Sequence, residues 1–247
     1  MDVSFQLYSA RDNTSWESVV RDIARLGYTQ TEGFPGVYGD PDGFRRLLDA
    51  HGLTMPSGHF PLDMLENDLA RALDICALLD MSRIYCPMLD QTDRPSDRTG
   101  WRAFATRLQT VQKDLSEAGI EFGWHNHDYE FLAAPDGTIP MREILDGAPD
   151  IGWEADIAWI VRGGDDPMDW IERYGCRIGT AHVKDIAPPG LCPDEDGWAD
   201  VGHGTLDWRA LKTALHAAGC DLYVVEHDKP SDIQRFARRS IAALRSY

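Results

Sequence analysis

The chain has 247 residues, 43% of them hydrophobic, so it is long enough to build one large domain with a sizeable core. Its 41 acidic residues against 24 basic ones give a formal net charge of −17, and such a surface repels phosphate backbones. No apolar run reaches the roughly 18 residues of a membrane span, and the first residues do not resemble a secretory signal. The composition therefore disfavours nucleic-acid and membrane partners and predicts a cytoplasmic protein.

Strand-like and helix-like segments alternate along the chain. Strands are expected at 3–9, 28–34, 54–60, 82–89, 120–127, 151–159, 178–185 and 221–228. Helices are expected at 15–27, 40–52, 67–80, 98–119, 140–147, 166–175, 207–219 and 232–246. Glycine follows the apolar periodicity of four helices, at Gly27, Gly52, Gly119 and Gly219, as is typical of helix ends.

Eight strand–helix pairs in one chain of this length predict a closed (β/α)₈ (TIM) barrel, an α/β fold that spans 1–247 as a single domain. A doubly wound open sheet is the alternative. It would place a glycine-rich phosphate-binding turn after the first strand, where this chain reads SARDN (9–13). Two connections, 128–140 and 186–206, are long enough to suggest function. The second is a candidate lid, with Trp198 or His203 reaching inward.

Most histidines are expected at the carboxyl ends of the predicted strands, where an α/β barrel carries its active site. These are His59, His125, His127, His182 and His227, five of the eight in the chain. Acidic residues also lie at the carboxyl ends of predicted strands, among them Glu32, Glu154, Asp156, Glu226 and Asp228. Because buried carboxylates are costly unless they are paired or bind a cation, a divalent ion is predicted. The alternative is a hydrogen-bonded polar rim that holds no metal.

Several short segments, in their order along the chain, resemble one superfamily. HNHDYEF, EADIAW, AHVKD, VGHGTLDW and VVEHD look like the sugar isomerase/epimerase superfamily of xylose isomerase-like TIM barrels. Its members include tagatose/psicose 3-epimerases, inosose dehydratases and hydroxypyruvate isomerases. The resemblance implies one divalent ion held by Glu, Asp, His and Glu of the last four strands. An oxygen-rich set favours Mn²⁺, with Mg²⁺, Co²⁺ or Zn²⁺ as alternatives.

Three of the implied metal ligands match directly: Asp156, His182 and Glu226. The epimerase relatives end strand 5 in a glutamate, whereas this chain has HNHD there and a glutamate only at Glu130. We expect Glu130 to be the fourth ligand. If the loop turns Glu130 away, His125 or His127 must substitute.

A divalent ion that chelates a carbonyl and the neighbouring hydroxyl acidifies the adjacent C–H bond, and a base then forms a metal-bound enediolate. Return of the proton gives epimerisation or isomerisation, and loss of a β-oxygen gives dehydration or glycoside elimination. We predict a sugar isomerase/epimerase, with a dehydratase or keto-glycoside lyase as the alternative. By resemblance Glu130 and Glu226 transfer the protons, and His127 is a further candidate base.

The expected substrate is an unphosphorylated sugar, keto-sugar or cyclitol. Candidate substrate contacts are Glu32, His59, His125, Lys184 and His203. Lys184 could instead pair with Asp185, and His203 stands where relatives often carry glutamate. One of Trp124, Trp153 and Trp159 is expected to pack on a sugar face. A non-catalytic sugar-binding subunit and an abasic-site endonuclease are weaker alternatives, and a homo-oligomer stays open.

Overall fold

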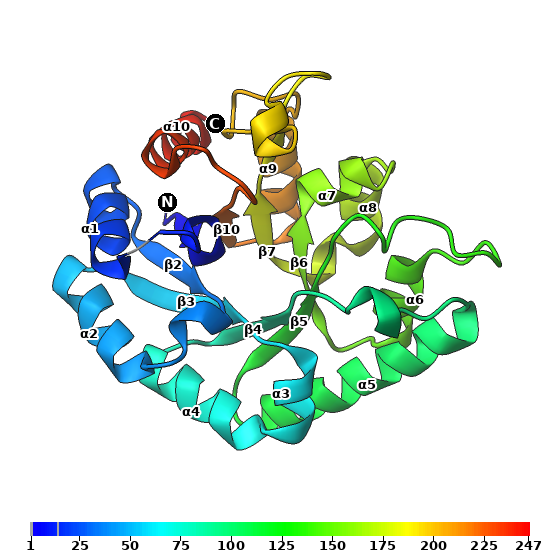
Figure 1. The fold of residues 1–247 in the computed structure, drawn as a ribbon. Helices are drawn as coiled ribbons and strands as arrows, with labels where there is room; N and C mark the ends of the chain where they lie inside the picture. The colour runs from blue at the N-terminus through cyan, green and yellow to red at the C-terminus, as the bar shows by residue number, and fades with distance from the viewer. Residues whose placement is uncertain (1, 14) are drawn as a thin grey trace.

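Eight parallel strands close into a barrel in the computed structural model, which describes residues 2–13 and 15–247 (Figure 1). The order around the barrel is β1-β10-β7-β6-β5-β4-β3-β2. Their bounds are β1 Ser4–Gln6, β2 Gln30–Gly33, β3 Thr54–His59, β4 Arg83–Cys86, β5 Glu121–His125, β6 Gly152–Asp156, β7 Ile178–Val183 and β10 Leu222–Val225. The predicted (β/α)₈ barrel is confirmed.

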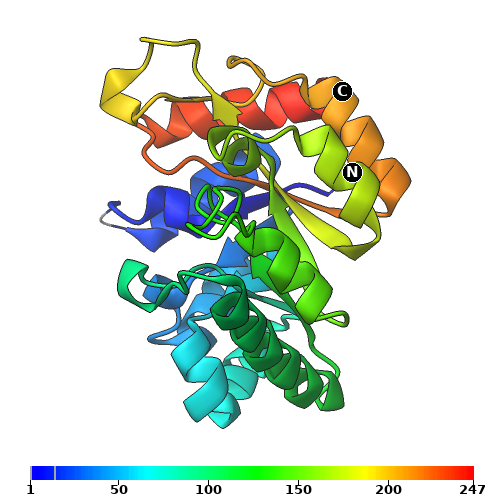
Figure 2. The same cartoon turned by 90° about the vertical axis from the view of Figure 1, so that its right-hand side faces the viewer.

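The helices form an outer ring around the strands (Figures 1 and 2). The ring consists of α1 Trp16–Leu26, α2 Pro41–His51, α4 Leu69–Leu79, α5 Arg98–Glu117, α6 Pro140–Gly147, α8 Pro167–Tyr174, α9 Trp208–Ala218 and α10 Ile233–Ser246. Local chemistry sets their ends: the Ser15 side chain caps α1, which ends at Gly27 with φ 98°. None of the helices in the described residues is long and apolar enough to cross a bilayer.

The strand register brings polar residues of neighbouring strands side by side. Glu32 of β2 lies opposite Gln6 of β1 and Ser57 of β3. His125 of β5 lies opposite Glu154 of β6, and Asp156 of β6 lies opposite His182 of β7. Because side chains two residues apart on a strand point the same way, Glu154 and Asp156 face the same side of the barrel wall.

All eight predicted strands end earlier than expected, and two of them pass directly into a helix. The strand expected at 3–9 stops at Gln6, and a 3₁₀ helix, Leu7–Ala10, follows it. The strand expected at 151–159 is wrong beyond Asp156, where helix α7, Ile157–Arg162, begins. The Asp156 side chain accepts a hydrogen bond from the Trp159 backbone N–H at 3.0 Å and so acts as the helix cap. Another short helix, α3 Leu62–Asn67, lies in the loop after β3.

The long loop 186–206 is ordered by a small antiparallel hairpin, in which β8 (Asp185–Ile186) pairs with β9 (Trp198–Ala199). The carboxylate of Asp185 accepts hydrogen bonds from the backbone N–H groups of Ile186, Gly202, Gly204 and Leu206. Asp185 therefore closes this loop, and the alternative ion pair between Lys184 and Asp185 is not formed.

Candidate active site

A cavity of about 1130 Å³ opens at the carboxyl ends of the barrel strands. The histidines His59, His125 and His127 line it together with Glu226 and Asp228. The side chains of Trp159 and Trp198 also line it, and their rings meet edge to face at 4.8 Å. The cavity therefore lies where the sequence places the reactive side chains, and Trp198 of the candidate lid reaches it as expected.

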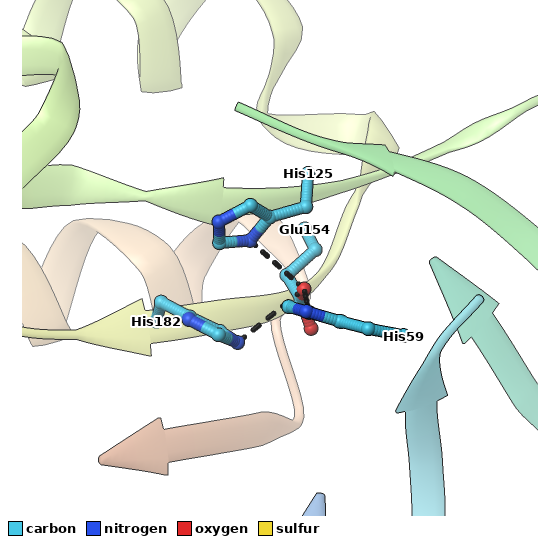
Figure 3. A group of neighbouring side chains, drawn as sticks. All are labelled: His59, His125, Glu154 and His182. Atoms are coloured by element: carbon cyan, nitrogen blue, oxygen red, sulfur yellow. Dashed lines mark hydrogen bonds and ion pairs between the residues drawn. The ribbon is translucent and has the colours of Figure 1, made fainter. Parts of the chain in front are cut away.

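Four buried residues near the cavity bring metal-ligand atoms within 4.8 Å of one another: His125, Asp156, His182 and Glu226. We call this set the Asp156 group. A second set, the Glu154 group, shares two of its histidines and contains His59, His125, Glu154 and His182. Figure 3 shows the Glu154 carboxylate at the centre of three imidazoles. Its Oε2 atom lies 2.6 Å from His59 Nε2, 3.0 Å from His125 Nδ1 and 3.3 Å from His182 Nε2.

The two ring nitrogens of His182 have different carboxylate partners. Its Nδ1 lies 2.8 Å from Glu226 Oε2 and 3.9 Å from Asp156 Oδ2. Its Nε2 lies 2.7 Å from Glu32 Oε1. Since one ring nitrogen is engaged by Glu32, the other is directed toward the Asp156 group, as is usual for a metal-binding histidine.

The Asp156 group fits a divalent metal ion. Asp156 Oδ2 is buried and, within the described residues, accepts no hydrogen bond, although the Lys184 ammonium lies 3.3 Å away. Because Lys184 already supplies a cation to this carboxylate, the fit to a metal ion rests on the donor set of the whole group. Two carboxylates and two imidazoles form a donor set that suits Zn²⁺ or Mn²⁺.

Lys184 carries a buried positive charge beside this group. Its ammonium lies 3.3 Å from Glu226 Oε2 and 2.8 Å from Asp228 Oδ2, and only 1% of the residue is exposed. Burial raises the pKa of Asp156 to about 6, although the charges of Lys184 and His182 oppose it. Burial also acts to raise the pKa of Glu226, but Lys184 and His182 outweigh it and lower that pKa. Lys184 therefore helps to keep the Glu226 carboxylate ionised.

Two imidazoles in the cavity are held in opposite charge states. Burial acts to lower the pKa of His59, but Glu154 and Glu32 outweigh it and raise the pKa to about 9. Burial and the charge of Lys184 lower the pKa of His127 to about 3. At neutral pH one ring is thus an imidazolium and the other a neutral imidazole, which is the arrangement expected of an acid and a base.

The structure does not bring Glu130 to either group. Its carboxylate accepts hydrogen bonds from Trp124 Nε1 at 3.0 Å and from the His127 backbone N–H at 2.9 Å. Burial raises the pKa of Glu130 to about 8. Glu130 therefore closes the turn after β5, and His125 occupies the place in the ligand set that we expected for Glu130.

Three of the expected substrate contacts do not line the cavity. Glu32 is fully buried below it and accepts hydrogen bonds from Gln6 Nε2 at 2.8 Å and from the Ser57 hydroxyl. His203 is exposed and does not line the cavity. Lys184 is also absent from the lining, and it contacts carboxylates instead. Of the candidate substrate contacts, His59 and His125 line the cavity.

Sequence reasoning left Glu154 out of the candidate site. Its position two residues before Asp156 on one strand is the signal that could have identified it. The three tryptophans that were candidates for packing on a sugar lie in different places. Trp124 and Trp153 are buried in the barrel wall, while Trp159, on α7, lines the cavity.

A family model described as a xylose isomerase-like TIM barrel matches residues 20–247. The chain belongs to this family. The membership agrees with the superfamily resemblance of its motifs and supports the prediction of an enzyme.

Known proteins resemble the chain over most of its length. An inosose dehydratase from Lacticaseibacillus casei is 22% identical to this chain, and the aligned region covers 85% of this chain and 81% of the dehydratase. The structure of a sugar phosphate isomerase/epimerase from Parabacteroides distasonis has a TM-score of 0.80 at 21% identity, over 98% of this chain and 92% of that one. The IolI protein, solved with a bound zinc atom, has a TM-score of 0.77 at 15% identity, over 100% and 96% of the two chains.

Proposed function

We propose that the protein is a metal-dependent lyase that eliminates a β-oxygen substituent from an unphosphorylated cyclic keto-sugar or cyclitol ketone. The observation that carries the proposal is the composition of the Asp156 group. Within the described residues this group contains one glutamate, Glu226, and His125 takes the position expected for a second one. The paired glutamates that we expected to act as the two bases of a 3-epimerase are therefore not assembled.

Epimerisation and elimination place different demands on a site. Epimerisation needs a base on each face of one carbon, whereas elimination needs a base for the C–H bond and an acid for the departing oxygen. A neutral His127 and a cationic His59, both lining the cavity, match the second demand. The name of the L. casei relative, a dehydratase, supports the same class of reaction.

The residues of the Asp156 group would hold the divalent ion, which when bound supplies a Lewis acid that polarises a carbonyl oxygen. His127 accepts the proton from the carbon next to the carbonyl, and the electron pair of that C–H bond forms the new C=C bond. The bond from the β-carbon to oxygen breaks, and His59 donates a proton to the departing oxygen. The products are an unsaturated ketone and water or an alcohol.

The remaining residues orient these groups. The partly exposed Trp159 ring lines the cavity and offers an apolar surface for the C–H face of a sugar, whereas Trp198 is buried with Arg162 stacked over its ring. The Asn126 side chain accepts hydrogen bonds from the Asp156 backbone N–H at 3.0 Å and from Trp153 Nε1 at 2.8 Å. It thereby ties the end of β5, which carries His125 and His127, to the end of β6.

The test is a product analysis in D₂O with the metal-loaded protein and a panel of keto-sugars and cyclitol ketones. We expect an unsaturated ketone, or its tautomer, to accumulate, detected by its ultraviolet absorbance and mass. The His127→Gln variant should lose this activity by at least about 100-fold, in line with general base catalysis. The matched control is His203→Gln, which alters an exposed histidine outside the cavity and should leave activity unchanged.

Two other outcomes would contradict parts of this proposal. Deuterium in a recovered ketose or its epimer, without any unsaturated product, would identify an isomerase or epimerase. An unchanged rate in His127→Gln would remove His127 from the reaction.

A further inference from the structure

We infer that the cavity contains a second, apolar subsite that binds an uncharged apolar aglycone, so that the substrate is a keto-glycoside and the leaving group is an alcohol. The inference rests on the proposed elimination and names its substrate class. We define the aglycone subsite as the apolar residues of the loops after β1 to β4 that line the cavity: Tyr8, Phe34, Pro35, Leu62, Met88 and Leu89.

The catalytic residues and the apolar residues that line the cavity come from opposite halves of the barrel. Metal-ligating and aromatic side chains such as His125, Trp159 and Glu226 follow the last four strands. The aglycone subsite follows the first four strands, which contribute His59 to the catalytic side. Both halves line the same cavity, so a ligand at the catalytic half can extend onto the apolar half without leaving it.

The aglycone subsite presents apolar surface to solvent that a ligand could cover. Tyr8 is 39% exposed and Met88 is 46% exposed, and they are two of six large hydrophobic residues exposed in the described part of the chain. The Tyr8 ring meets Phe34 edge to face at 5.5 Å, and Phe34 in turn packs against Trp16 at 5.9 Å. These contacts hold an aromatic surface in place at the cavity wall, where an apolar group gains from burial.

The size of the cavity also favours a substrate larger than one ring. At about 1130 Å³ it is slightly larger than the roughly 300–1000 Å³ of cavities that bind drug-sized ligands. A single hexose or cyclitol bound at the catalytic half would leave the apolar half in contact with water. A glycoside fills both halves.

The charges around the aglycone subsite argue against an anionic substituent. Asp63, Asp90 and Asp93 line the cavity on this side, and Arg107 there is paired with Glu66 at 2.8 Å. Arg11 also lines it and stacks over the Tyr8 ring at 4.1 Å, but the acidic residues outnumber the basic ones. Their net negative charge disfavours a phosphate or carboxylate, and an apolar ring carries no such penalty. The elimination then breaks the bond between the anomeric carbon and the glycosidic oxygen, and the aglycone leaves as a neutral alcohol after it receives a proton.

The experiment compares the methyl and benzyl β-glycosides of one 3-keto-glucose with the metal-loaded protein. Methanol and benzyl alcohol are leaving groups of closely similar acidity, so a difference in kcat/KM reports binding of the aglycone. We expect the benzyl glycoside to be preferred by about 10- to 100-fold, the range that full burial of a phenyl group supplies. The preference should fall at least fivefold in Met88→Ala and in Phe34→Ala. It should persist in Met168→Ala, which removes an exposed methionine from α8 and lies outside this cavity.

Failure of this inference is distinguishable from failure of the proposed function. Elimination from both glycosides at the same rate overturns the aglycone subsite and leaves the lyase standing. If neither is cleaved, the lyase proposal fails for keto-glycosides, and calorimetry with unreactive benzyl and methyl β-glucosides still tests the subsite. In that calorimetry, equal dissociation constants for the benzyl and methyl glucosides would overturn the aglycone subsite. A benzyl preference that stays the same in both Met88→Ala and Phe34→Ala would overturn it as well.

Discussion

At the scale of single residues, Glu32 determines which nitrogen of His182 is available to a metal. Its carboxylate is fully buried, and Gln6, Ser57 and His182 all donate hydrogen bonds to it. Burial acts to raise the pKa of Glu32, but the neighbouring His182 and His59 outweigh it and hold the pKa well below its usual value. An ionised Glu32 therefore orients the His182 ring and leaves Nδ1 facing the Asp156 group.

We predict that Glu32→Gln weakens metal binding by about 10- to 100-fold, as is typical for loss of a carboxylate that orients a metal-binding histidine. The amide keeps the volume of the side chain but removes its charge. Calorimetric titration with Zn²⁺ and Mn²⁺ measures the effect. Glu130→Gln is the matched control, because Glu130 is an equally buried glutamate outside both groups. Equal losses of affinity in the two variants would contradict the prediction.

At the scale of elements, ion pairs between buried carboxylates of the hairpin loop 186–206 and more exposed arginines of α10 hold the loop onto this helix. Arg235 of α10 lies 2.6 Å from Glu195 and 2.9 Å from Asp200, both in the loop. Arg239 adds a contact to Asp200 at 3.1 Å. The loop carries Trp198 into the cavity wall, so these pairs fix one side of the active site to the outer ring of helices.

The Glu195–Arg235 pair should make stability depend on acid pH. Burial acts to raise the pKa of Glu195, but hydrogen bonds from Arg235 and Ser231 outweigh it and lower the pKa to about 2. A lowered pKa in the folded state stabilises the fold above the ordinary value of 4.5, and this contribution is lost as pH falls toward 2. Thermal unfolding of wild type and Glu195→Gln should therefore differ most above about pH 4.5 and converge near pH 2. The exposed neighbour Asp194, changed to Asn, should give no such pattern.

At the scale of the whole molecule, the Asp156 group connects the last four strands of the barrel. Its ligands come from β5, β6, β7 and the end of β10, strands that are adjacent around the closed barrel. A metal ion bound there would link the carboxyl ends of four strands. It would also displace the proton that His182 carries, since Glu154 and Glu226 outweigh burial and hold the His182 pKa well above its usual value.

We predict that a divalent ion stabilises the protein and that chelation removes this stabilisation. At a free metal concentration of 100 times Kd, linkage gives about 2.7 kcal/mol of added stability. Differential scanning calorimetry with Zn²⁺ or Mn²⁺, before and after EDTA, measures the shift in Tm. The shift should vanish in His125→Ala and persist in Glu130→Gln. A metal-dependent shift retained in His125→Ala would place the ion elsewhere.

The sequence by itself determined the fold and the face on which the candidate site lies. Period-two and period-3.6 patterns, helix-ending glycines such as Gly27 and the regular alternation of elements depend on local chemistry, so they identified the barrel. Because a barrel aligns the carboxyl ends of its strands, the acids and imidazoles there had to meet. Asp156, His182 and Glu226, which the family resemblance implied as metal ligands, do lie close together.

Only the tertiary structure decided how those side chains divide their contacts. Glu130 turns to Trp124 and the backbone of its own loop, Glu32 serves His182, and His203 remains outside the cavity. A strand-end position cannot distinguish these cases, because the direction of a loop residue depends on which donors the neighbouring strands and helices bring within reach. The same holds for Lys184, whose partners Asp156, Glu226 and Asp228 come from the ends of two strands, β6 and β10, that meet when the barrel closes.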